Sequence, residues 1–194
     1  MIPEHRTRYN AAFTTAKYQE MMADIDQQFP GQLDFRVAET PVFIPADLRN
    51  KLIAAGDSII DVIQQNNFKE LTEAAIPPHQ RVPGNEGRPD FLTFDFAVCR
   101  NTAGNLEPQL IEMQGFPSLY AFQAWLPGVF GSHFPISGSV SAFLNSPDAA
   151  GYLEEMRGFL LGNEVPENVI LLEIYPDKQK TRIYFVITKY FWGI

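Results

Sequence analysis

The sequence predicts an α/β fold in which helices flank a mixed sheet. Stretches with apolar side chains at helical spacing alternate along the chain with shorter segments of strand character. Two of these segments, at about 91–115, are joined by a polar turn and predict an antiparallel hairpin. The aliphatic run NVILLEIYP at 168–176 is typical of a strand buried on both faces of a parallel sheet. The length of 194 residues suits one substantial core, so we expect a single α/β domain over 1–194.

Composition and charge exclude several classes of function. The chain has 15 basic and 23 acidic residues, a net charge of -8, and no cluster of Lys and Arg. This balance argues against a surface for nucleic acid or for anionic membranes. One cysteine, Cys99, cannot form an internal disulfide framework. With no signal peptide and no long apolar run, we expect a cytoplasmic and soluble protein.

The hairpin has one apolar face and one polar face. In the first strand the apolar residues at 92, 94, 96 and 98 alternate with small or acidic residues, which include Thr93 and Asp95. In the second strand Leu110, Glu112 and Gln114 alternate with Ile111, Met113 and Gly115. If the connecting NTAGN loop folds symmetrically, Asp95 lies opposite Glu112 and Thr93 lies opposite Gln114.

Two carboxylates directly across from each other disfavour folding unless water, a base or a cation separates their charges. A divalent metal ion would separate the charges of Asp95 and Glu112. The alternative is a polar sheet face that is simply solvated, which needs no metal.

The hairpin resembles the metal-binding strand pair of circularly permuted ATP-grasp ligases of the glutathionylspermidine-synthase type. The shared features are a strand that ends in Asp, a polar turn, two aliphatic residues, Glu, any residue, an amide side chain and a nearby Pro-Ser. The resemblance implies Asp95, Glu112 and Gln114 as ligands of the magnesium ion that bridges ATP phosphates, with Gln114 where that family has Asn. It also implies a pre-ATP-grasp-like arrangement of the sheet and helices.

Three further residues are candidate contacts for an acidic substrate. Arg36 and Glu39 lie in the segment LDFRVAETPVFIP at 33–45, which alternates like an extended chain and is interrupted by prolines. Arg36 can bind a carboxylate through its planar fork, or the two residues can form a local ion pair. Ser118 can cap a helix whose amino end offers N–H groups to a phosphate or carboxylate, or it can act as an ordinary cap. No residue is assigned a catalytic role.

The remaining elements are predicted as helices separated by loops. Residues 1–13 are polar and mixed, and 77–90 form an irregular loop rich in proline. Ile183, Val186, Ile187 and Tyr190 keep helical spacing before Gly193, while a hairpin through YPDKQKTR is the local alternative; the resemblance favours the helix. The predicted helices are 14–29, stopped by Pro30-Gly31; 47–66; a short one at 68–76; 118–126, broken by Pro127-Gly128; 148–161, stopped by Gly162; and 183–192.

The chain stops at Ile194, where an α/β unit would begin its next strand, so we expect a truncated amino-terminal portion of a longer ATP-grasp-like protein. The resemblance implies an ATP-dependent carboxylate–amine ligase with magnesium and ATP as cofactors and a small carboxylate and an amine as substrates. No glycine-rich loop with paired lysines is present, so this portion is expected to be inactive alone. The alternative is a non-catalytic domain that binds a small ligand or a protein through the same polar face.

Overall fold

The computed structural model describes residues 1–84, 87, 89–116 and 119–194. Over these residues the protein has seven α-helices and one two-stranded antiparallel sheet, which confirms the α/β class. The chain divides into two compact units, one formed by Met1–Phe43 with Ser118–Ile194 and the other by Ile44–Pro117. The single domain over 1–194 stays a prediction. Within the described residues, none of the helices is both long and apolar enough to cross a membrane.

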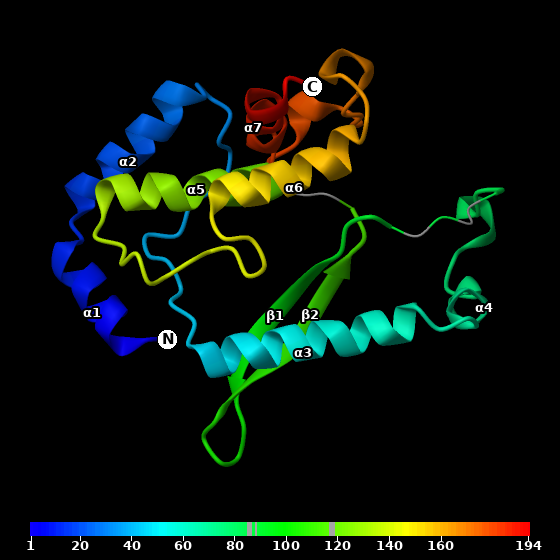
Figure 1. Cartoon of the computed structure of the whole chain (residues 1–194), viewed down its shortest axis with the longest axis horizontal. Coiled ribbons are helices and arrows are strands. Elements are labelled where there is room, and N and C mark those ends of the chain that lie inside the picture. The colour runs from blue at the N-terminus through cyan, green and yellow to red at the C-terminus, as the bar shows by residue number, and fades with distance from the viewer. Residues whose placement is uncertain (85–86, 88, 117–118) are drawn as a thin grey trace. The chain divides into compact units, whose positions relative to one another are not determined.

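Unit 1 is helical (Figure 1). Its central helix is α5, which packs against α2, α6 and α7. The buried side chains come from several helices and include Met21, Ile25, Phe122, Ile183 and Ile187. The helices of this unit are α1 (Pro3–Ala12), α2 (Thr15–Gln28), α5 (Tyr120–His133), α6 (Ala149–Leu161) and α7 (Ile183–Trp192), with short 3-10 turns η2 (Pro166–Asn168) and η3 (Pro176–Lys178).

Three helix ends are set by local chemistry, as predicted. The Thr14 side chain accepts a hydrogen bond from the Lys17 N–H at 3.2 Å, and the Asp148 carboxylate accepts one from the Gly151 N–H at 2.9 Å. Gly193 ends α7 in the left-handed conformation, with φ 76°. The last element is therefore a helix, and the alternative hairpin is wrong.

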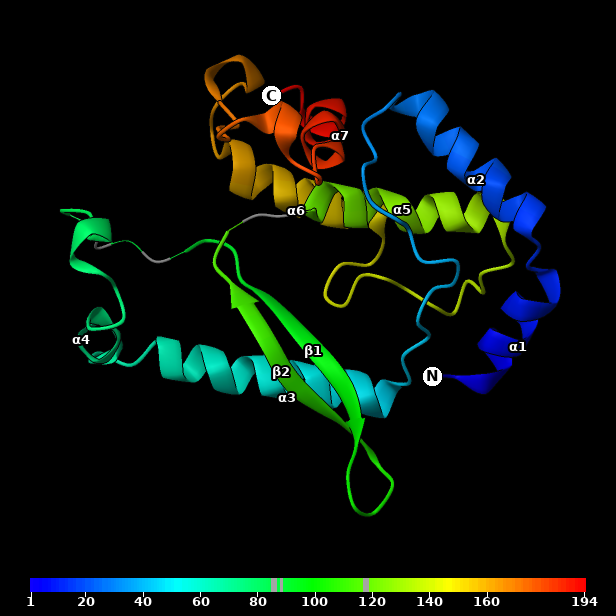
Figure 2. The same cartoon turned by 180° about the vertical axis from the view of Figure 1, so that it is seen from behind.

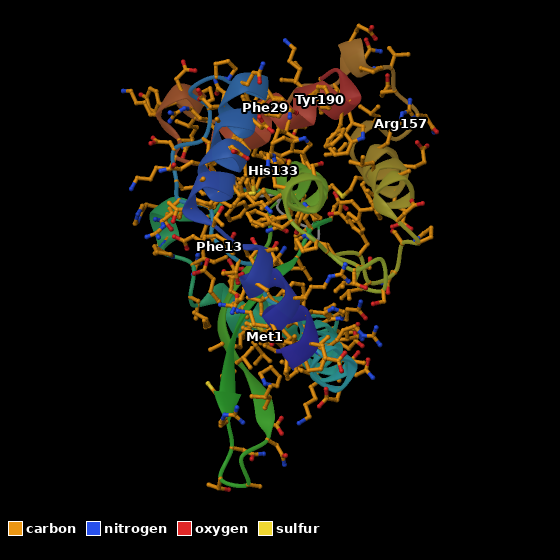
Figure 3. All side chains as sticks on the ribbon, turned by 90° about the vertical axis from the view of Figure 1, so that its left-hand side faces the viewer. Met1, Phe13, Phe29, His133, Arg157 and Tyr190 are labelled. Carbon is orange, nitrogen blue, oxygen red and sulfur yellow. The ribbon has the colours of Figure 1, made fainter. Side chains whose placement is uncertain are left out.

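Helix α1 was not predicted, because its apolar residues have no helical periodicity. Tertiary packing stabilises it instead. Tyr9 is fully buried, and its ring lies 4.9 Å from that of Phe134 and 6.2 Å from that of Phe43 between centroids. Figure 3 shows Met1 and Phe13 at the two ends of this helix. Pro3 at its start has the backbone angle that a first helical residue needs.

Helix α5 continues through Pro127, so the predicted break at Pro127-Gly128 is wrong. A proline inside a helix costs about 3 kcal/mol. Phe122, Val129 and Phe130 of the same helix are buried, and burying each such side chain contributes about 1.5–3 kcal/mol. The packing of α5 therefore outweighs the cost of its proline.

The predicted buried strand at 168–176 is also wrong. No strand is formed there, and the side chains of Ile170 and Leu172 are 84% and 88% exposed. An extended segment becomes a strand only when a neighbouring strand accepts and donates its backbone hydrogen bonds. Over the described residues, the only two strands pair with each other in unit 2.

The segment at 33–45 runs without regular secondary structure, and donors from α1, α2 and the amino terminus hold its carbonyl groups. The Tyr18 hydroxyl donates to the Val37 carbonyl and the Tyr9 hydroxyl to the Glu39 carbonyl, both at 2.7 Å. The Ile2 N–H donates to the Phe43 carbonyl at 2.8 Å. These bonds fix an extended segment that has no partner strand.

Unit 2 is a hairpin packed against a long helix, α3 (Figure 2). Gly56 of α3 faces Phe94 of β1, and a Cβ at this position would lie in ordinary contact with the ring, at 3.7 Å. Lys51 of α3 donates to the Leu106 carbonyl at 2.9 Å and to Glu107 at 2.7 Å. The elements of this unit are α3 (Ala46–Ile63), α4 (Phe68–Glu73), the turn η1 (Pro78–Gln80), β1 (Thr93–Arg100) and β2 (Leu106–Gln114).

We expect Tyr9→Phe to destabilise unit 1 by about 1–2 kcal/mol, because the Glu39 carbonyl loses its donor. Burial raises the pKa of Tyr9 from its ordinary value near 10 to about 12. The folded state therefore keeps this proton to higher pH than the unfolded state does, and stability falls as the pH rises from about 10 to about 12.

Urea unfolding of wild type and Tyr9→Phe across this pH range measures both effects. The variant should lose the part of the alkaline decline that Tyr9 causes. Tyr190→Phe is the matched control, since Tyr190 is 67% exposed. Parallel pH profiles for wild type and Tyr9→Phe would contradict the assignment.

Candidate functional site

The polar face of the hairpin brings the predicted metal ligands together. Asp95 is the cross-strand partner of Glu112, and Thr93 is the partner of Gln114, as predicted. Cross-strand partners in an antiparallel pair project to the same face of the sheet. Asp95 and Glu112 are exposed, and Gln114 is half-buried.

A β-bulge at Ile111 produces this register. Next to the loop, Arg100 pairs with Leu106 and Phe96 pairs with Leu110. Continued without a bulge, this ladder would place Ile111 opposite Asp95. Ile111 instead has no partner, and the pairing resumes one residue later, between Asp95 and Glu112.

Because of the bulge, the predicted faces of the second strand are wrong. Leu110 was expected to share a face with Glu112, but it is paired with Phe96 and lies on the face that also carries Phe94 and Met113. The unpaired Ile111 is 68% exposed. One extra residue therefore moves Glu112 from the apolar face of the ladder to the polar one.

Glu107, on the same strand as Glu112, has a basic partner, Lys51. Glu107 accepts hydrogen bonds from Lys51 at 2.7 Å and from the Asn101 amide at 3.3 Å. In the described part of the chain, no Lys, Arg or His forms an ion pair with Asp95 or Glu112. Two like charges therefore face each other, and none of the basic residues that the structure describes pairs with either.

Gln114 completes this polar group, because its amide nitrogen donates a hydrogen bond to Glu112 Oε1. Two carboxylates and an amide oxygen are hard ligands of the kind that magnesium prefers. Magnesium usually takes only one or two protein carboxylates and completes its shell with water and phosphate. The residues thus fit a partial magnesium site. Over the described residues, no group of three or more His, Cys, Asp or Glu is placed to hold a metal ion.

The predicted substrate contacts lie in unit 1, where Arg36 and Glu39 form an ion pair. The hydrogen bond from Arg36 is the main cause that lowers the pKa of Glu39, and the same bond raises the pKa of Arg36. The Arg36 side chain is 78% exposed, so its remaining donors are open to solvent. The local ion pair weighed from the sequence is therefore present, and substrate binding stays a prediction. Ser118 lies outside the described residues.

A pocket of ≈ 620 Å³ adjoins this ion pair. Glu39 and Tyr18 line it together with Arg6, which donates to the Thr40 hydroxyl. The sequence did not indicate Arg6, because it belongs to α1 and meets Thr40 only through the fold. No local pattern connects residues 34 positions apart.

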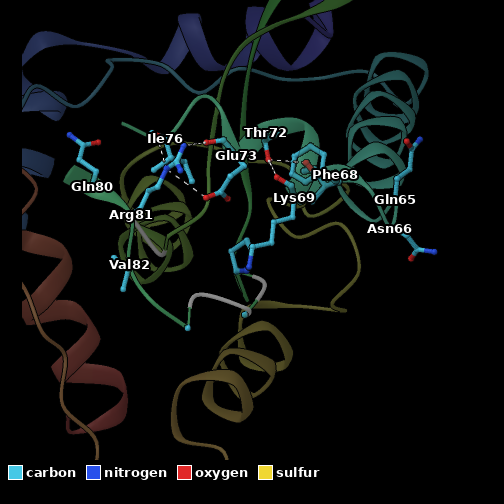
Figure 4. A pocket seen from close by; sticks show the side chains of 14 residues that line it. Gln65, Asn66, Phe68, Lys69, Thr72, Glu73, Ile76, Gln80, Arg81 and Val82 are labelled. Carbon is cyan, nitrogen blue, oxygen red and sulfur yellow. Dashed lines mark hydrogen bonds and ion pairs between the residues drawn. The ribbon is translucent and has the colours of Figure 1, made fainter. Parts of the chain in front are cut away.

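Unit 2 holds another pocket, of ≈ 520 Å³, around α4 and the loop that follows it (Figure 4). Arg81 closes this loop: its guanidinium donates to the Ile76 carbonyl at 3.3 Å and the Glu73 carbonyl at 3.4 Å. It also lies 3.7 Å from the Glu73 carboxylate. These contacts give Arg81 a structural role in holding the loop.

Compared with known protein families, curated proteins and solved structures, the chain matches none. The functional argument therefore depends on the residues of the two units themselves.

We expect Glu112→Gln to stabilise the protein by about 0.2–1 kcal/mol without metal, because it removes one of two opposed like charges. Glu107→Gln is the matched control. Glu107 lies on the same strand, and its substitution removes an ion pair with Lys51. We expect this control to leave stability unchanged or to lower it. Urea unfolding in chelator at low salt measures both, and equal effects of the two substitutions would contradict the charge argument.

Proposed function

We propose that this chain is the amino-terminal metal- and substrate-binding portion of an ATP-dependent carboxylate–amine ligase. The proposed type is the circularly permuted ATP-grasp ligase, glutathionylspermidine-synthase-like, with a pre-ATP-grasp-like arrangement of the chain. The observation that carries the proposal is the pairing of Asp95 with Glu112 on an exposed sheet face, where no basic residue within the described part of the chain forms an ion pair with either carboxylate. A cation bound there offsets the repulsion, and the adjacent Gln114 offers a further oxygen.

In such a ligase ATP phosphorylates a carboxylate, and the amine nitrogen then attacks the acyl carbon and expels phosphate. Asp95, Glu112 and Gln114 would hold the magnesium, which supplies electrostatic stabilisation of phosphate charge when bound. Arg36 would orient the carboxylate substrate through its solvent-facing donors, and Glu39 would hold the guanidinium in place. Ser118 is the further proposed substrate contact. The proposed substrates are therefore a small acid and an amine.

A non-catalytic domain that binds a small ligand or a protein through the same face is the second candidate. Exposed apolar side chains near the carboxylates favour it. Ile111 and Phe116 are 68% and 56% exposed, and apolar side chains of this kind are frequent in binding surfaces. The two functions differ in whether magnesium binds at Asp95 and Glu112.

We expect magnesium, alone or with ADP, to stabilise the wild type in a saturable manner. A ligand that binds only the folded state stabilises it by RT ln(1 + [L]/Kd), about 1.4 kcal/mol at ten times Kd and 2.7 kcal/mol at a hundred times Kd. Asp95→Asn and Glu112→Gln should lose this shift, and Glu107→Gln should keep it. Thermal unfolding at graded magnesium concentrations measures it, and equal shifts in all four proteins would reject the metal site.

We expect no ATP turnover by this chain with any pair of carboxylate and amine, because it has no glycine-rich loop with paired lysines for the nucleotide. Phosphate release is the measurement, with Asp95→Ala as the control. Steady hydrolysis that Asp95→Ala abolishes would contradict the prediction.

A further inference from the structure

Unit 1 contains a pocket of ≈ 430 Å³ that the ligase proposal does not use. We call it the Pro127 pocket. Helix α5 forms one wall with Gln123, Leu126, Pro127 and Phe130, which lie on one stripe of the helix. The extended segment at 37–43 forms the second wall, and Ile136, Val140 and Ala142 of the following loop form the third. The volume lies within the range of small-molecule sites, about 300–1,000 Å³.

Each wall is held by contacts that do not involve a ligand. The extended segment is fixed by its hydrogen bonds from Tyr9, Tyr18 and Ile2. In the loop, Ser141 Oγ donates to the Phe143 carbonyl and accepts from the Phe143 N–H, both at 3.0 Å. The pocket is therefore preformed, which lowers the entropy cost of binding.

Pro127 leaves a hydrogen-bond acceptor on the wall formed by α5. In a regular helix the N–H of residue 127 donates to the carbonyl of Gln123, four residues earlier. Proline has no N–H, so the Gln123 carbonyl lacks this donor. Gln123 and Pro127 both line the pocket, on the same stripe of the helix as Leu126 and Phe130.

The chemistry of the lining restricts the ligand. None of the described residues that line the Pro127 pocket is charged, and its polar side chains are Thr40, Gln123 and Ser141. A charged ligand would lose hydration without a counter-charge, whereas an apolar one gains from burial. We propose that the Pro127 pocket binds a small, uncharged, mainly apolar molecule that donates one hydrogen bond to the Gln123 carbonyl.

The test compares 2-naphthol with 2-methoxynaphthalene, which have the same ring system but differ in the hydroxyl donor. Equilibrium dialysis against the whole chain at pH 7 measures both affinities. We expect 2-naphthol to bind about three- to tenfold more tightly, the effect of one net hydrogen bond. Amide chemical shifts should change in residues 123–130.

Two substitutions test the pocket and the acceptor separately. Ala142→Trp should fill the pocket and abolish binding of both probes, while Ala150→Trp, on the exposed surface of α6, should not. Pro127→Ala restores the N–H donor to the Gln123 carbonyl, so the preference for 2-naphthol should fall to about onefold while 2-methoxynaphthalene still binds.

Three results would overturn the proposal. The first is no binding of either probe to the wild type, and the second is binding that Ala142→Trp leaves intact. The third is a preference for 2-naphthol that persists in Pro127→Ala. Circular dichroism of each variant establishes that a loss of binding is not a loss of fold, and Ala150→Trp controls for the added indole.

Discussion

The carbonyl groups of the extended segment at 37–43 receive no hydrogen bonds from a neighbouring strand. Unit 1 depends on the other groups that donate hydrogen bonds to them. The Tyr18 and Tyr9 hydroxyls and the Ile2 N–H supply donors to three of its carbonyls, those of residues 37, 39 and 43. A buried carbonyl without a donor costs about 1–3 kcal/mol, so these bonds decide the path of the chain. They also join α1 and α2 to the wall of the Pro127 pocket.

The same accounting of backbone hydrogen bonds explains Pro127. A proline in the middle of a helix removes one donor, and the packing of α5 against its neighbours offsets that cost. Gln123, whose carbonyl loses this donor, is exposed and lines the Pro127 pocket. Pro127 therefore lowers the stability of the helix locally and also contributes to the lining of the pocket.

The hairpin of unit 2 combines an irregular ladder with two carboxylates that face each other. The bulge at Ile111 directs Glu112 to the face of Asp95, and Lys51 neutralises Glu107 but not this pair. Like charges in solvent repel only weakly, so the fold tolerates them. The facing carboxylates of Asp95 and Glu112 add nothing to folding, which is consistent with selection for binding at the proposed metal site.

The sequence by itself determined the features that depend on neighbouring residues. The helix starts near Thr14 and Asp148 and the stop at Gly193 follow from local side-chain chemistry, and the hairpin follows from alternation on both sides of a polar turn. Alternation could not locate the bulge, because an unpaired residue has no signature in a period of two. The candidate metal ligands were therefore predicted correctly as neighbours, although the faces of β2 were not.

Only the tertiary structure decided the elements whose stability comes from distant contacts. Tyr9 makes α1 a packed helix although its sequence has no apolar stripe, and burial carries α5 through Pro127. Conversely, the aliphatic run at 169–174 has the composition of a strand but no partner to complete its hydrogen bonds. Local propensity contributes tenths of a kcal/mol per residue, whereas burial and hydrogen bonding contribute one or more, so the distant contacts prevail.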